Sequence, residues 1–267
     1  MVALDTLKVL VPRDVLRDYD EKAFRRRLDE GRVKGTVIET HRLSRDIVKQ
    51  TCGLNAVDIG EESFTVEVSA KILGELYPRG ITAETVDRIP EAIRAAGILD
   101  LDAPAFLEGA EVLRCDAAVN LPVEDVQDSL RHLRLLGVND RYHVRPYNGT
   151  GIVFMREAKT VKERLQFYDK FGYMNRSDKK WIQSGKLDSE PFRGMLRAEA
   201  NFKNFKSVRR MFGVEEPRRL LDVLSSGHQP VLTVFERVLN DPEVEEAAAG
   251  FIAAGIDPLR SILFNQS

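Results

Sequence analysis

Carboxylates stand inside three otherwise apolar, strand-like segments of this chain. Asp116 lies in VLRCDAAVN, Glu199 in MLRAEANFK and Glu67 in FTVEVSAK. Because side chains alternate between the two faces of a strand, Asp116 shares a face with Arg114, and Glu199 shares one with Arg197. Carboxylates that converge on one sheet face form an oxygen-rich site suited to Mg²⁺ or Mn²⁺. For Glu67 alone, a solvent-facing position on a half-covered sheet is the simpler interpretation.

A tyrosine stands near the end of another strand-like segment, RLQFYDK. Tyr168 could attack a metal-bound phosphodiester, since the metal would offset the high reference pKa of a phenol, about 10, and stabilise in-line displacement. Lys170 would lie on the same face if the strand continues that far, where its charge would favour a phenolate and hold phosphate. Tyr173 is an alternative nucleophile or a second tyrosine. This chemistry is the attack of a tyrosine oxygen on phosphorus.

The charge of the chain is unevenly distributed. The 267 residues carry a net charge of −2, which argues against a uniformly basic nucleic-acid coat. Residues 151–220, however, hold 17 Lys and Arg against 9 Asp and Glu, a net of +8, so the remainder carries −10. This asymmetry predicts a local surface for a polyanion, although basic stretches can also do no more than solvate a surface.

Basic and aromatic side chains near Tyr168 are candidates for holding a DNA strand. Trp181 stands next to two lysines and is the best candidate for stacking on an unpaired base, whereas Phe167 and Phe192 fit a core better. The predicted DNA-binding residues are Lys162, Arg164, Arg176, Lys179, Lys180, Trp181 and Lys203.

Several other classes of site are excluded by missing motifs. The sequence has no GxxxxGK[ST] phosphate loop, no GxSxG and no HExxH. The four histidines are scattered, and two cysteines are too few for a disulfide scaffold. We expect a protein of the reducing cytoplasm with no membrane span, because no stretch approaches about 18 apolar residues.

The elements that must position these residues are predicted from periodicity and turn signals. Strands are expected at 4–11, 35–43, 63–68, 111–120, 141–147, 151–156, 163–170 and 195–203, with a hairpin at Asn148-Gly149. Helices are expected at 82–96, 122–136, 206–212, 216–225, 230–239 and 243–254. We therefore predict an α+β fold, with an antiparallel sheet backed by helices over residues 1–205 and a C-terminal helical segment over 206–267.

Four ordered blocks resemble the replication initiators of filamentous phages and related plasmids, which start rolling-circle replication and are related to the HUH nickases. The blocks are VEVSAKILGELYPRGIT (66–82), VLRCDAAVNLPVEDVQDSLRHLR (112–134), RLQFYDK (164–170) and MLRAEANFKNFKSVRRMFGV (195–214). The first block lacks the family's Gly-His-Asn, and the histidine pair of the wider nickase superfamily is absent, so metal ligation would rest on carboxylates.

The resemblance implies a site-specific nicking and joining enzyme of the bacterial host cytoplasm. Tyr168 would form a 5′-phosphotyrosyl link, Lys170 and Arg197 would contact phosphate, and Mg²⁺ or Mn²⁺ would be held by Asp116, Glu199 and Glu67. Its partners would be origin DNA, a host helicase and a second copy of the chain on DNA. Two alternatives stay open, namely an origin-binding or copy-control protein without the chemistry, and a conjugative relaxase.

Overall fold

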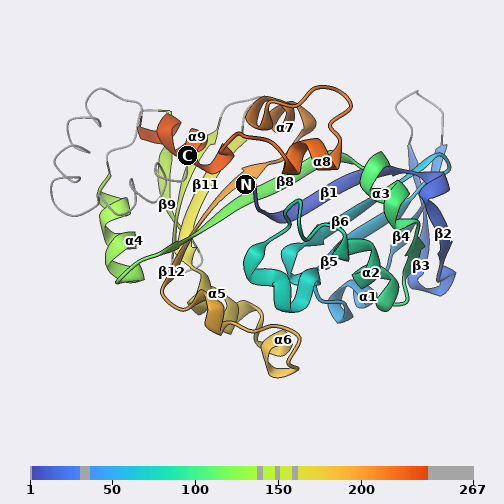
Figure 1. Cartoon of the computed structure of the whole chain (residues 1–267), viewed down its shortest axis with the longest axis horizontal. Helices are drawn as coiled ribbons and strands as arrows, with labels where there is room; N and C mark the ends of the chain where they lie inside the picture. The colour runs from blue at the N-terminus through green and yellow to red at the C-terminus, as the bar shows by residue number, and fades with distance from the viewer. Residues whose placement is uncertain (1, 31–36, 137–140, 148–150, 158–161, 240–267) are drawn as a thin grey trace. The chain divides into compact units, whose positions relative to one another are not determined.

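The computed structural model has an α+β fold in which antiparallel strands are backed by helices (Figure 1), as the sequence predicts. It describes residues 2–30, 37–136, 141–147, 151–157 and 162–239. The chain divides into two compact units, the first formed by residues 1–116 and 203–228, the second by residues 117–202 and 229–267. Among the helices of the described ranges, none is long and apolar enough to cross a membrane.

The first unit contains a sheet with the strand order β3-β4-β5-β6-β1-β8, in which β8 contributes its residues up to Asp116. Its strands are β1 (Leu4–Pro12), β3 (Phe24–Glu30), β4 (Val37–Leu43), β5 (Leu54–Ile59), β6 (Ser63–Ser69) and β8 (Glu111–Pro122), and β2 (Leu16–Tyr19) pairs separately with β7 (Leu99–Leu101). Its helices are α1 (Arg45–Gln50), η3 (Ala70–Arg79), α2 (Arg88–Ala95), α3 (Ala103–Gly109), α7 (Phe205–Phe212) and α8 (Leu220–Leu224), besides the 3-10 turns η1 (Arg13–Val15) and η2 (Glu21–Ala23).

The second unit contains the remainder of β8 and four more strands, in the order β8-β12-β11-β10-β9. The strands are β9 (His143–Tyr147), β10 (Gly151–Glu157), β11 (Lys162–Asp169) and β12 (Met195–Phe202). The helices are α4 (Val126–Leu135), α5 (Lys170–Ser177), α6 (Lys179–Gln183) and α9 (Pro230–Leu239), with the turn η4 (Glu190–Phe192). In Figure 1, α5 and α6 lie at one end of these strands.

One face of the second unit's sheet is apolar and is covered by α9. The ring of Phe167 on β11 is buried between Phe154 of β10, at 6.0 Å, and Phe235 of α9, at 5.6 Å between centroids. The edge of this face holds the buried carboxylate of Glu163, which accepts hydrogen bonds from the Tyr142 hydroxyl (2.9 Å) and from Arg237 of α9 (2.7 Å). Aromatic packing and a paired charge therefore both fix α9 on β11.

Side-chain caps set two helix starts that matter for the site. The Asp125 carboxylate accepts hydrogen bonds from the amides of Gln127 and Asp128, so α4 begins at Val126, later than the predicted start at 122. The Asp169 carboxylate likewise accepts from the Gly172 amide at 2.9 Å. Because of that cap, β11 ends at Asp169, and Lys170 begins α5 rather than continuing the strand as predicted.

The other predicted elements agree with the structure to different degrees. The predicted helix 82–96 shortens to α2 at 88–95, with Pro90 buried in its first turn instead of interrupting it. The predicted helix at 216–225 contracts to α8 at 220–224. From 206 onward, the described chain contributes α7 and α8 to the first unit and α9 to the second. The Asn148-Gly149 turn and the predicted helix 243–254 lie outside the described residues.

Replacing Phe167 tests how far the second unit depends on its apolar face. Phe167→Ala removes a fully buried ring between two others, so we expect the free energy of unfolding to fall by about 3–5 kcal/mol. Leu135→Ala, on α4 where Leu135 is 65% exposed, is the control and should change it by less than about 1 kcal/mol. Urea unfolding measures both, and equal effects would show that this face is not the core of the unit.

Candidate active site

The opposite face of the second unit's sheet carries a ladder of polar side chains. In the register of β11 with β12, three consecutive residue pairs on this face are polar on both strands. The pairs are Arg164 with Asn201, Gln166 with Glu199, and Tyr168 with Arg197. Since directly opposed residues of an antiparallel pair share a face, all six side chains lie together.

Glu199 is the centre of this ladder. Its Oε1 accepts hydrogen bonds from Gln166 Nε2 at 2.6 Å and Asn201 Nδ2 at 3.2 Å, and its Oε2 accepts one from the Tyr168 hydroxyl at 3.0 Å. The Nε of Arg197 lies 3.8 Å from Oε2. A buried carboxylate needs such partners, because an isolated buried charge costs several kcal/mol. The network thus satisfies the buried carboxylate and fixes the direction of the Tyr168 hydroxyl.

Two buried cations flank the Tyr168 phenol. Arg197 donates to the side-chain oxygen of Asn120 on β8 at 3.1 Å, which holds its guanidinium beside the site. Lys170 is only 1% exposed, and its Nζ lies 5.7 Å from the ring centroids of Tyr168 and Tyr173. The structure therefore brings together the predicted catalytic residues Tyr168, Lys170 and Arg197.

A glycine lets two tyrosines meet across three strands. Tyr147 of β9 pairs with Gly151 of β10, which pairs with Tyr168 of β11, so all three positions share the polar face. A Cβ at Gly151 would lie 2.7 Å from the Cβ of Tyr168 and 2.5 Å from the carbonyl oxygen of Phe167. Because Gly151 has no side chain, the rings of Tyr147 and Tyr168 approach to 5.5 Å between centroids.

Tyr147 and Tyr173 complete an aromatic cluster around Tyr168. The Tyr173 ring lies 5.3 Å from that of Tyr168, and the Arg164 guanidinium lies 5.0 Å over the ring of Tyr147. Burial, followed by the charge of Glu199, raises the pKa of Tyr147 to about 12, against the opposing effect of Arg164. Tyr147 therefore stays a neutral phenol at physiological pH.

The predicted metal ligands do not all belong to this unit. Asp116 is half-buried on β8 in the first unit, and Glu67 on β6 of that unit forms an ion pair with Arg114 at 3.6 Å. Within the described ranges, no three His, Cys, Asp or Glu side chains group closely enough to hold a metal ion. Both oxygens of Glu199 already accept hydrogen bonds, so this carboxylate fits a hydrogen-bond acceptor better than a metal ligand.

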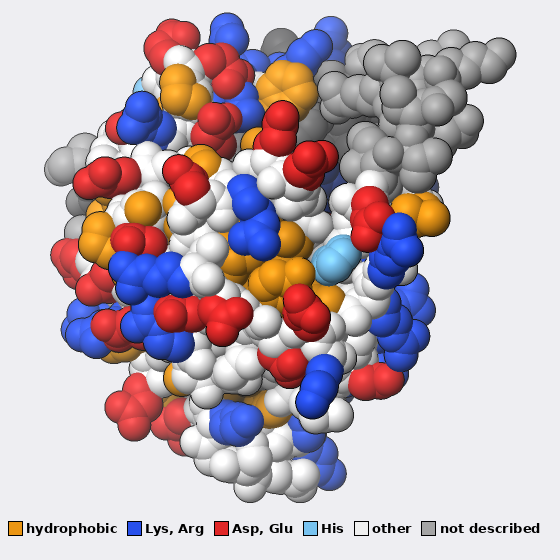
Figure 2. Space-filling view, turned by 90° about the vertical axis from the view of Figure 1, so that its right-hand side faces the viewer, with side chains coloured by type: hydrophobic (Ala, Val, Ile, Leu, Met, Phe, Trp, Pro, Cys, Tyr) orange, Lys and Arg blue, Asp and Glu red, His pale blue; other side chains and the backbone are white. Residues whose placement is uncertain are grey.

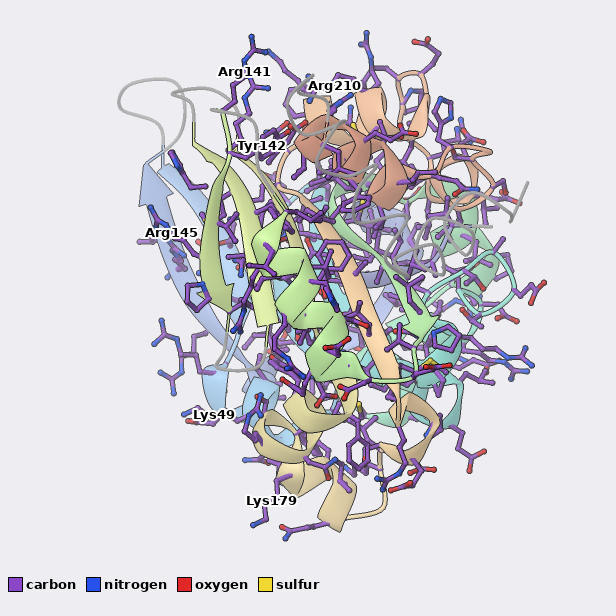
Figure 3. All side chains as sticks on the ribbon, turned by 90° about the vertical axis from the view of Figure 1, so that its left-hand side faces the viewer. Lys49, Arg141, Tyr142, Arg145, Lys179 and Arg210 are labelled. Atoms are coloured by element: carbon purple, nitrogen blue, oxygen red, sulfur yellow. The ribbon has the colours of Figure 1, made fainter. Side chains whose placement is uncertain are left out.

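The predicted DNA-binding residues lie in three places, namely strand β11, helices α5 and α6, and the first unit. Arg164 belongs to the polar ladder, and the side chain of Lys162 lies outside the described residues. Arg176, Lys179 and Lys180 are exposed on α5 and α6, and Figure 3 shows Lys179 projecting from the far end of these helices. Trp181 is half-buried, with the Nζ of Lys180 and of Lys186 at 4.0 and 5.2 Å from its ring. Lys203 is exposed in the first unit.

Several residues of the ladder are not among the predicted site residues. Gln166, Asn201, Tyr147 and Asn120 contact the predicted residues directly, and Gly151 makes room for them. Alternation along RLQFYDK and MLRAEANFK places Gln166 and Asn201 on the site face. Placing Tyr147 beside Tyr168 also needed the pairing of β10 with β11 through Gly151, which the predicted hairpin of β9 and β10 does not reveal.

A side chain at Gly151 should force β10 away from β11. We expect Gly151→Ala to lower the free energy of unfolding by about 1–3 kcal/mol, the usual cost of overpacking, and to alter the near-ultraviolet circular dichroism of the tyrosine cluster. Gly227→Ala, where an added Cβ meets no atom within 4 Å, is the matched control and should be close to neutral. A Gly151→Ala protein as stable as wild type would contradict the close approach.

The raised pKa of Tyr147 predicts that the stability of the fold decreases at high pH. Because the native state holds this proton more tightly than the unfolded chain does, Tyr147 stabilises the fold below pH of about 10, and the stabilisation is lost as pH rises toward about 12. Tyr147→Phe should remove one phenolate transition near pH 12 from the absorbance titration and should reduce the alkaline loss of stability. A transition that disappears near pH 10 instead would show that Tyr147 is not held by burial.

Comparisons with known proteins establish no family for this chain. No family model matches the sequence, and no curated protein matches it. Among solved structures, the chain is similar to a rolling circle replication initiator protein from Geobacillus stearothermophilus, with 13% sequence identity and a TM-score of 0.30. The match covers 79% of this chain and 78% of that one. At this level of similarity, the function has to be argued from the polar ladder itself.

Proposed function

We propose that this protein nicks and rejoins DNA to initiate rolling-circle replication of a phage or plasmid, with Tyr168 as its nucleophile. The observation that carries the proposal is the 3.0 Å hydrogen bond from the Tyr168 hydroxyl to the buried Glu199, with Arg197 and Lys170 beside it. A phenol, an acceptor for its proton and two cations are the groups that transesterification at phosphorus requires.

In the proposed reaction, the Tyr168 oxygen attacks the phosphorus of a DNA phosphodiester. The bond from phosphorus to the tyrosine oxygen forms as the bond to the 3′ oxygen breaks. Glu199 takes the phenolic proton, and the leaving 3′ oxygen ends as a hydroxyl by gaining a proton. The products are a 5′-phosphotyrosyl link and a free 3′-OH, and attack by a 3′-OH on the same link reverses the step and joins the strand.

The energetic cost of this proton transfer explains why the cations matter. Reference pKa values of about 10 for tyrosine and about 4.3 for glutamate make full transfer uphill by about 8 kcal/mol. One opposite charge at 4–6 Å contributes a few kcal/mol at an effective dielectric constant of about 20. Lys170, whose Nζ lies 5.7 Å from the centroid of the Tyr168 ring, therefore offsets part of the cost, and the remainder requires that the proton moves while the oxygen attacks.

A divalent metal, Mg²⁺ or Mn²⁺, is a separate part of the proposal, and it does not use Glu199, whose two oxygens already accept hydrogen bonds. Such a metal, when bound, would neutralise charge on the phosphate oxygens. Origin DNA as the substrate, a host helicase and a second copy of the chain on DNA are proposed partners. None of the steps derived above passes through the metal.

The burial of Tyr168 favours a second candidate, a DNA-binding protein for replication control that cuts no strand. Tyr168 is only 3% exposed, and the half-buried Tyr147 and Tyr173 lie against its ring. Strand cleavage therefore requires one of these two rings to move aside, whereas a purely structural ladder requires no movement at all.

A covalent-capture experiment separates the two candidates. The full chain is incubated with supercoiled plasmid or with a pool of random-sequence single strands labelled at the 3′ end, with Mg²⁺, Mn²⁺ or EDTA, and resolved in SDS. We expect a labelled adduct with the wild type. Tyr168→Phe should abolish it, whereas Tyr147→Phe and Tyr173→Phe, which remove neighbouring hydroxyls from the same cluster, should retain it.

Each of the other outcomes would overturn one part of the proposed function, namely the nucleophile, the cleavage reaction or the metal. An adduct that survives Tyr168→Phe and disappears in Tyr173→Phe would move the nucleophile to α5. DNA binding without an adduct under any condition would support the second candidate. An adduct that forms equally well in EDTA would remove the divalent metal from the proposal.

A further inference from the structure

Helix α7 in the first unit is buried and apolar on one side and exposed and basic on the other. Val208, Met211 and Phe212 are buried and pack into the unit. The other side carries the exposed cations Lys206 and Arg209, and the exposed Lys203 precedes the helix. Arg210, which follows Arg209 in the sequence, is labelled in Figure 3. No acidic residue occurs in the helix sequence FKSVRRMF. We call Lys203, Lys206 and Arg209 the α7 strip.

The cations of the α7 strip have no ion pair within the ranges that the structure describes. Two exposed arginines of the same unit, by contrast, have acidic partners. Arg25 lies 3.8 Å from Asp46, and Arg42 lies 3.2 Å from Asp58. Figure 2, which views the molecule from the side where β2 and β3 lie in Figure 1, shows Lys and Arg interspersed with Asp and Glu. The positive charge of the α7 strip is therefore not locally neutralised.

The arrangement of the strip fits a phosphate backbone. Lys206 and Arg209 are three residues apart and so lie on one side of the helix, about 4.5 Å apart along its axis. Lys203 precedes the helix, which begins at Phe205 after the extended N-cap residue Asn204. Successive phosphates of one DNA strand are about 3.4 Å apart, so the axial spacing of Lys206 and Arg209 is close to that of neighbouring phosphates.

Two features of α7 disfavour other polyanions. The apolar side of the helix is used in the core, so the helix has no free apolar face to insert into a lipid surface. Phe205 is 46% exposed, but the Arg218 guanidinium lies 5.0 Å over its ring. The strip therefore lacks an open aromatic platform of the kind that binds unpaired bases.

We propose that the α7 strip is a docking surface for the phosphate backbone of duplex DNA. It belongs to the first unit, whereas the tyrosine ladder belongs to the second. Its three cations contact phosphates, and phosphate contacts carry no sequence information, so binding through the strip is independent of sequence and strongly salt-dependent. The inference does not rest on strand cleavage, because it concerns binding of an uncut duplex.

The test compares two variants with the same loss of charge in the same unit. K203A/K206A/R209A removes the strip, and R25A/R26A/R42A removes three exposed arginines that have acidic partners. Binding of the full chain to a labelled random-sequence duplex is measured over a range of salt concentrations. Each lost phosphate contact lowers the slope of log affinity against log salt by about 0.9, so the strip variant should lose about 2.7 and the paired variant almost nothing.

Each remaining outcome decides against the proposal or for it. Equal losses in both variants would show that total charge, not the strip, binds DNA, and an unchanged slope in the strip variant would also overturn the proposal.

A single strand of the same length is the second probe, and an equal loss there would overturn the assignment to duplex. If the triple variant does not fold, Lys206→Ala and Arg209→Ala are tested singly, each expected to lower the slope by about 0.9. Loss of slope without any covalent adduct in the capture experiment would leave this inference standing while removing the nickase.

Discussion

The pairing of β11 with β12 places a carboxylate at the centre of a buried polar face, and the rest of the candidate site follows from satisfying it. Glu199 is buried on an inner strand, where an ionised carboxylate is tolerated only with several hydrogen bonds and a nearby cation. Gln166, Asn201 and Tyr168 supply the hydrogen bonds, and Arg197 supplies the charge. A shift of one residue in this register would turn these side chains to the opposite face.

The same network limits the chemistry that Glu199 can perform. Three donors and a guanidinium already occupy this carboxylate, so any proton that it takes must displace or reverse one of these contacts. In the proposed reaction Glu199 both orients the Tyr168 hydroxyl and takes its proton, while Arg197 and Lys170 stabilise the charge that develops on oxygen. This division of roles also explains why Lys170 has to be buried, since a solvated ammonium at the same distance would be screened.

The sequence predicts much of the fold, because apolar and polar residues alternate along strands that have one apolar face. It places β1, β6, β8, β10, β11 and β12 close to their observed bounds. It misses β3, whose FRRRLDE has no apolar alternation, and β5. In the site, alternation correctly puts Arg197 and Glu199 on one face. It does not predict that the Asp169 cap ends β11 before Lys170, or that Gly151 brings Tyr147 against Tyr168, because both depend on contacts between elements.

Strand β9 carries Tyr147, one of the two tyrosine rings that lie against Tyr168. It is the edge strand of this sheet, and none of its five side chains is fully buried. Its pairing with β10 therefore supplies most of what holds it, and segments with few buried contacts open locally far more often than cores do. Since Tyr147 belongs to β9 and lies against the Tyr168 ring, one local opening moves the covering ring while β11 and β12 stay paired. The register that buries Glu199 can thus persist while the phenol it orients becomes accessible.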